Sequence, residues 1–102
     1  MTLWTKINAL IAGISDPKTR IDVATSINYL YNLFSHGAIS EDQLRSDLKE
    51  ICASVLEASN PLLTEEEAMR RAEAVVDDLI RTMKLESVHH RVRVRLKSLF
   101  PP

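Results

Sequence analysis

The residues able to carry out nucleophilic or acid–base chemistry are few in this sequence, and they do not form a constellation. The chain of 102 residues contains one cysteine and three histidines. Cys52 stands among apolar residues at helical spacing with no base marked beside it, so we expect a buried, inert thiol. His36 precedes Gly37 at the end of a helical pattern, where an imidazole can bond to the last carbonyls.

Metal-binding and cofactor-binding patterns are also missing from the sequence. His89 and His90 are adjacent, so on a helix they diverge by about 100° and cannot bind one ion together. Glu86 can share a helical face with His90, but two ligands do not make a metal site. The sequence contains no phosphate-binding glycine loop and no nucleophile elbow. We therefore predict no catalytic residues, no metal, no cofactor and no small-molecule ligand, and a protein that is not an enzyme.

Length and composition predict a single helical domain over residues 1–102. Only two glycines and five aromatic residues occur, which disfavours a turn-rich β fold. Apolar residues recur at helical spacing over residues 3–14, 17–36, 41–59 and 65–83, and capping or stop residues separate each of these segments from the next. The expected fold is a small all-α bundle of four or five helices. Trp4 falls on the apolar arc of the first segment, so we expect it in the core.

The C-terminal segment, residues 87–102, has two interpretations. Its apolar stripe lies nearly opposite the stripe of residues 75–83, so we predict a break near residues 84–87 and a fifth helix that Ser87 caps. Strict alternation of apolar and basic residues also fits a β-strand. A lone strand would leave its backbone groups unpaired, and no second strand is predicted, so helix is the preferred interpretation.

Charge is distributed unevenly along the chain. The net charge is −1, yet residues 40–86 carry −6 and residues 87–102 carry +4. A basic segment of this kind can dock on acidic protein helices or bind nucleic acid phosphates. The acidic neighbouring region and the lack of interleaved aromatic residues favour docking on protein. The residues predicted to make either contact are His90, Arg91, Arg93, Arg95 and Lys97.

A second unusual stretch, residues 23–40, contains no charged residue in a chain that is 26% charged. A helix that merely faces water normally carries lysine and glutamate on its outer side. Depletion of charge with tyrosine present is typical of a protein interface, although burial within the chain's own bundle would also explain it. The predicted interface residues, opposite the expected core, are Thr25, Asn28, Tyr29, Asn32, Ser35 and His36.

These surfaces predict the class of function. We expect a non-catalytic protein-interaction module, either a homo-oligomer or a small subunit of a larger assembly. The alternative is a nucleic-acid-associated accessory protein that binds phosphates through its basic C-terminal segment. No stretch approaches the roughly 20 apolar residues that span a membrane, and the single cysteine is typical of a reducing compartment, so we expect a cytoplasmic protein with no membrane partner.

Overall fold

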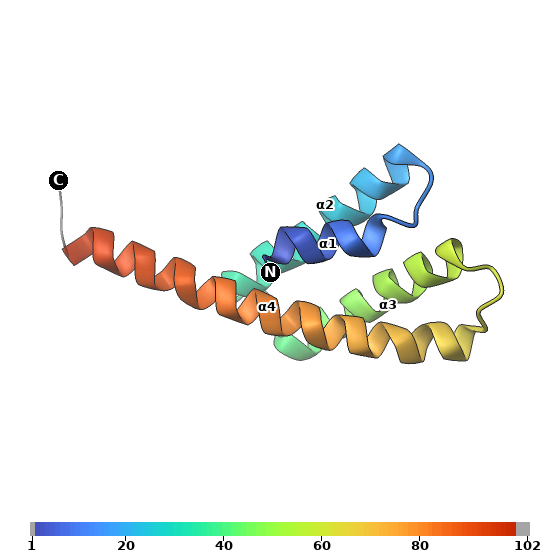
Figure 1. Ribbon diagram of the computed structural model, residues 1–102. Helices are drawn as coiled ribbons and strands as arrows, with labels where there is room; N and C mark the ends of the chain where they lie inside the picture. Colours follow the sequence, from blue (N-terminus) through green and yellow to red (C-terminus); the bar gives the residue numbers. More distant parts are fainter. Residues whose placement is uncertain (1, 100–102) are drawn as a thin grey trace.

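A computed structural model of the protein consists of four α-helices joined by short connections (Figure 1). The structure describes the backbone of residues 2–99 and the side chains of residues 2–87. The helices are α1 (Leu3–Ile11), α2 (Pro17–Ser35), α3 (Glu41–Ser59) and α4 (Glu65–Leu99). The predicted all-α bundle is confirmed, with four helices rather than five and no strand in residues 2–99.

Local capping fixes where the helices begin. Side-chain oxygens at the N-caps of α2, α3 and α4 accept backbone N–H bonds from the residue three positions ahead, as the sequence predicts. Gly37, just past the end of α2, adopts a φ of 75°, a left-handed conformation that favours glycine. The capping oxygens belong to Asp16, Ser40 and Thr64.

The core lies where the inner faces of all four helices meet. α3 and α4 contribute the longest apolar stripes and pack together most extensively. Trp4 was expected in this core but is 60% exposed, because the short helix α1 buries only Leu3, Ile7 and Ile11. The largest fully buried side chains are Ile7, Ile27, Leu44, Leu48, Cys52, Val76, Leu79 and Met83.

The predicted break near residues 84–87 is wrong, because α4 is one helix of 35 residues. Ser87 is a buried residue within this helix and not the cap of a fifth. The apolar stripe changes side because α4 runs beyond the ends of the other helices, so its two halves have different surroundings (Figure 1). Leu85, at the start of the second stripe, is 58% exposed.

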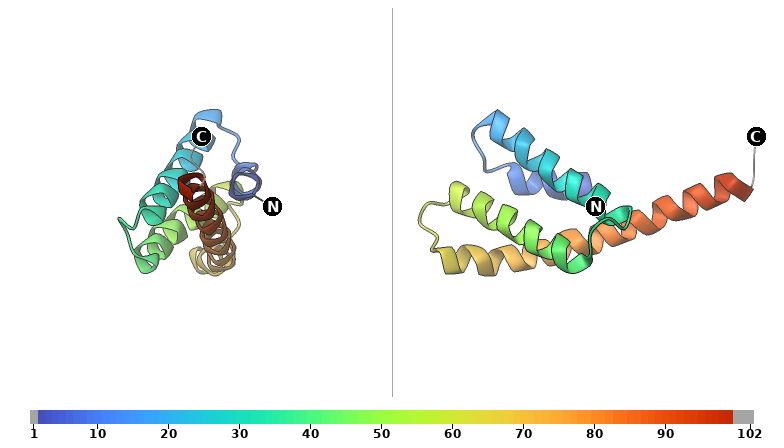
Figure 2. Two further views of the ribbon diagram at one scale, coloured as in Figure 1. Left: turned by 90° about the vertical axis from the view of Figure 1, so that its left-hand side faces the viewer. Right: turned by 180° about the vertical axis from the view of Figure 1, so that it is seen from behind.

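The helices pair as two hairpins, α1 with α2 and α3 with α4. Figure 2 shows that the hairpins lie close together around the N-terminus of α1 and separate toward the interhelical loops at the other end. α4 is about 50 Å long at roughly 1.5 Å per residue, and it follows the long axis of a molecule measuring 56 × 28 × 21 Å. The part of the basic C-terminal segment that belongs to α4, residues 87–99, is therefore at the end of the molecule opposite the α1–α2 and α3–α4 loops.

Truncating a core leucine should measure how much stability this packing provides. Leu48 of α3 is completely buried in the core, whereas Leu62 in the α3–α4 loop is 93% exposed. We expect Leu48→Ala to lower the free energy of unfolding by about 2–5 kcal/mol, since it leaves a cavity. Leu62→Ala, the same change in water, should lower it by less than about 0.5 kcal/mol. Urea unfolding followed by circular dichroism compares the two, and equal effects would contradict the described core.

Candidate protein interface

The uncharged side of α2 faces solvent. Thr25, Asn28, Tyr29, Asn32 and His36 are exposed and Ser35 is partly exposed. Tyr29 keeps 62% of its surface accessible. α2 buries only Ala24, Ile27 and Leu30, so the alternative explanation for the missing charge, burial of α2 on most sides within its own bundle, does not hold.

Ile21 extends this surface toward the start of α2. It lies one turn before Thr25 on the same side of the helix and is 65% exposed. Ile21 has no distinctive signal in the sequence, because it precedes the uncharged stretch and Asp22 follows it directly. We define the α2 face as Ile21, Thr25, Asn28, Tyr29, Asn32, Ser35 and His36.

Hydrogen bonding divides the polar groups of the α2 face into two kinds. The Ser35 hydroxyl and His36 Nδ1 both donate to the backbone carbonyl of Asn32, at 3.1 Å and 2.7 Å. The side-chain amides of Asn28 and Asn32 make no hydrogen bond within the described side chains, residues 2–87. These two amides lie one turn apart, so they can donate to and accept from a protein bound along α2.

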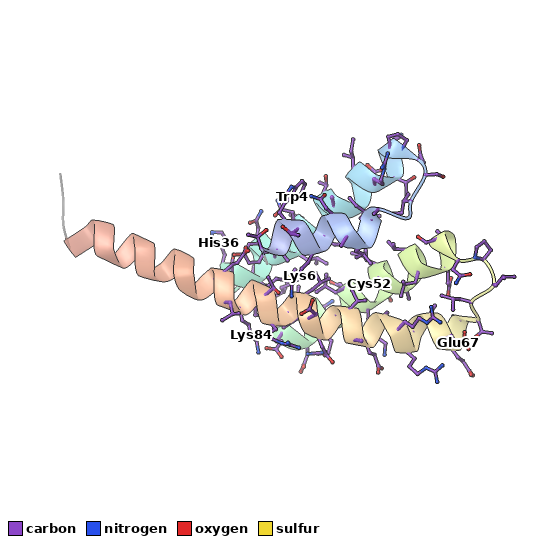
Figure 3. All side chains as sticks on the ribbon, in the orientation of Figure 1. Trp4, Lys6, His36, Cys52, Glu67 and Lys84 are labelled. Carbon is purple, nitrogen blue, oxygen red and sulfur yellow. The ribbon has the colours of Figure 1, made fainter. Side chains whose placement is uncertain are left out.

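A second exposed aromatic side chain lies on the helix that packs against α2. Trp4 belongs to α1 and is 60% exposed (Figure 3). Tryptophan and tyrosine are the residue types enriched at the energetic centres of protein interfaces. The α1–α2 hairpin therefore presents Trp4, Ile21 and Tyr29 as large side chains that a partner could cover.

Ion pairs join α4 to α1 and to α3. Lys6 of α1 contacts Asp78 of α4 at 2.6 Å, and this hydrogen bond lowers the pKa of Asp78 below its usual value. Asp77, the neighbouring residue of α4, contacts Arg45 of α3. Two further pairs join α3 to α4: Lys49 with Glu73, and Glu41 with Lys84. Many charges of the acidic region thus meet partners inside the bundle.

The predicted contacts of the basic segment lie outside the described side chains. The backbone of α4 places this segment beyond the ends of the other helices. Contact with phosphates or with an acidic protein therefore stays a prediction for His90, Arg91, Arg93, Arg95 and Lys97.

The candidate chemical groups are inaccessible or isolated. Cys52 is completely buried in α3, and loss of solvation raises the pKa of its thiol to about 12, so the reactive thiolate does not form near neutral pH. Across residues 2–87, no three His, Cys, Asp or Glu side chains are grouped to hold a metal ion. None of the helices, over the part of the chain that the structure describes, combines the length and apolar character required to cross a membrane.

Comparison of the chain with protein-family models, with curated proteins and with solved structures gave no significant match. Function must therefore be inferred from the surfaces of the bundle.

Burial of Cys52 predicts a thiol that does not react in the folded protein. At pH 8 an exposed thiol reacts readily with Ellman's reagent, because its ordinary pKa is about 8.5. We expect slow modification of the native chain and complete modification after unfolding in guanidinium. Ser54 is exposed on the same helix, so a Ser54→Cys variant should gain one fast-reacting thiol. Fast reaction of the unaltered native chain would contradict the described burial.

Proposed function

We propose that this protein is a non-catalytic interaction module that binds a protein partner or a second copy of itself through the α2 face. The observation that supports this proposal is the exposure of a neutral stripe bearing Ile21 and Tyr29 on a chain rich in charge. Interface centres are depleted of charged residues and enriched in aromatic ones, and the α2 face has this composition.

The energetics of the α2 face suit association. Burying Ile21 or Tyr29 from water contributes about 1.5–3 kcal/mol for each fully covered side chain, and Trp4 on the neighbouring helix α1 would add a similar amount if the partner also covered it. No lysine, arginine, aspartate or glutamate lies in residues 23–40, so a partner covering this stretch would not strip water from an unpaired ion of α2. The amides of Asn28 and Asn32 would fix the register by hydrogen bonding across the contact.

A charge added to the centre of the α2 face should prevent association. Asn32→Glu would place an unpaired carboxylate in a contact that otherwise lacks charge, so we expect a loss of affinity of at least ten-fold. For self-association through this face, light scattering of dilute protein should show a mass that falls toward the monomer value of 11.5 kDa. For a partner protein, a binding titration should show the same loss.

Ser46→Glu is the matched control, since it adds the same charge at an exposed position of α3 away from the α2 face. It should leave association unchanged. Equal behaviour of the wild-type, Asn32→Glu and Ser46→Glu proteins would remove the α2 face from consideration.

A second candidate function, nucleic-acid binding by the basic segment, is favoured by the length of α4. Repulsion from the acidic region opposes binding of nucleic acid, but α4 carries the +4 segment past the ends of α1, α2 and α3. Repulsion weakens with distance and is largely screened beyond about 8 Å at physiological salt. The basic segment could then meet phosphates at its own end of the molecule.

This alternative predicts salt-dependent binding. With about four phosphate contacts, the affinity for a fluorescent duplex should fall with a log–log salt slope of roughly −3 to −4. The double change Arg93→Glu and Arg95→Glu should abolish binding, whereas Arg71→Glu with Arg81→Glu, at exposed positions within the body of the bundle, should weaken it only slightly. Absence of binding in low salt would exclude this function for duplex nucleic acid.

A further inference from the structure

A groove opens between α2 and α3 where the two hairpins separate. Its volume is about 540 Å³, and its apolar lining includes Val23 of α2 and Ile51 and Val55 of α3. The lining spans about two turns of each helix, from residue 19 to 26 and from residue 50 to 58. The groove therefore matches about two turns of an incoming helix, which would bury one or two apolar side chains against this lining.

Two carboxylates flank this apolar lining. Asp22 of α2 and Glu50 of α3 both line the groove, and both residues are exposed. Neither carboxylate has an ion-pair partner within the described side chains of residues 2–87. An apolar groove with acids on both walls fits a helix whose apolar stripe is bordered by cations.

The chain itself contains such a helix. The backbone of α4 is helical through Leu99, and beyond Leu85 its sequence places Val88, Val92 and Leu96 at intervals of three and four residues. From residue 87 onward, the remaining positions include four basic residues and no acid. Helical spacing, charge and length thus agree with the occupant that the groove requires.

A molecule cannot fill its own groove with this segment. The groove lies beside the α1–α2 and α3–α4 loops, and α4 starts at that end and extends about 50 Å away from it (Figure 1). We propose that the groove between α2 and α3 binds the basic C-terminal end of α4 from a second copy, head to tail. This contact uses a different surface from the α2 face and does not depend on it.

Head-to-tail contact has a distinctive consequence. Each copy that docks its C-terminal end keeps an open groove, and each copy that receives one keeps a free end, so the assembly continues to grow unless it closes into a ring. The contact is only about two turns long, so growth should require high protein concentration. Complementary charge also makes the contact sensitive to salt.

Complementation between two blocked chains tests this arrangement. Ser54→Arg adds bulk and positive charge in the groove, and the double change Arg93→Glu with Arg95→Glu reverses charge on the docking helix. The groove change and the double change are each made separately in full-length Asn32→Glu protein, so that the α2 face does not contribute to association. We expect the Asn32→Glu parent to gain mass with concentration in light scattering and each blocked chain to remain at 11.5 kDa. An equimolar mixture of the two blocked chains should reach twice that mass and grow no further. The chain with the double change supplies an intact groove, and the Ser54→Arg chain supplies an intact basic end, so only one contact can form.

Matched controls test whether the effects are local. Ser46→Arg, at an exposed position elsewhere on α3, and Arg71→Glu with Arg81→Glu, at exposed positions in the body of the bundle, should associate like the parent. Three results would overturn the proposal: a parent that stays monomeric, a blocked chain that associates like the parent, or a mixture that stays monomeric. Association that nuclease removes would also overturn it and would assign the basic segment to nucleic acid.

Cross-linking provides a second measurement without the Asn32→Glu change. A Ser54→Cys chain mixed with a Leu96→Cys chain should form a disulfide-linked heterodimer under mild oxidation. A Ser46→Cys chain mixed with the same partner should not. Equal cross-linking of both mixtures would contradict docking in the groove, while the effect of Asn32→Glu on association reports separately on the α2 face.

Discussion

The most extensive packing in the bundle joins α4 to α3. Ala68 and Ala72 of α4 are completely buried, and their small side chains let the two backbones approach closely, while Val76, Leu79 and Met83 fill the rest of the seam. The same helix holds α1, since Asp78 pairs with Lys6 and Glu86 accepts the backbone N–H of Leu3 at 2.7 Å. α4 therefore organises the bundle first and then continues past it with a basic segment.

The distribution of charge follows from this arrangement. Lys6, Arg45, Lys49 and Lys84 meet acidic residues across helix boundaries, so these four cations are used within the bundle. Ion pairs at the surface contribute little to stability because water screens them, so their main effect is to orient helices that the apolar core already holds. The outer side of α2 takes no part in this network. The neutral α2 face, the acid-walled groove and the basic end of α4 are left as chemically different surfaces at different places on the molecule.

Local features of the fold could be predicted from the sequence, whereas features set by the ends of neighbouring helices could not. The caps Asp16, Ser40 and Thr64 act within one turn, and the buried stripes of α3 and α4 are set by periodicity alone. A break at residues 84–87 follows from the sequence only if the whole helix stays inside the bundle, and the apolar arc that includes Trp4 does not show which neighbours would cover it. The exposure of the α2 face and the groove beside Val55 depend on how two hairpins diverge, which no local pattern encodes.

The distance from the loop end of the bundle to the end of α4 tests this architecture most directly. Spin labels at Leu62→Cys, in the exposed α3–α4 loop, and at Ser98→Cys, near the end of α4, can be measured by pulsed electron resonance in dilute full-length protein, because native Cys52 is buried. A continuous helix predicts a narrow distribution near 50 Å, from about 1.5 Å per residue. A much shorter or broad distribution would mean that the basic segment folds back or that α4 breaks, and it would contradict both the projecting end and the head-to-tail contact that depends on it.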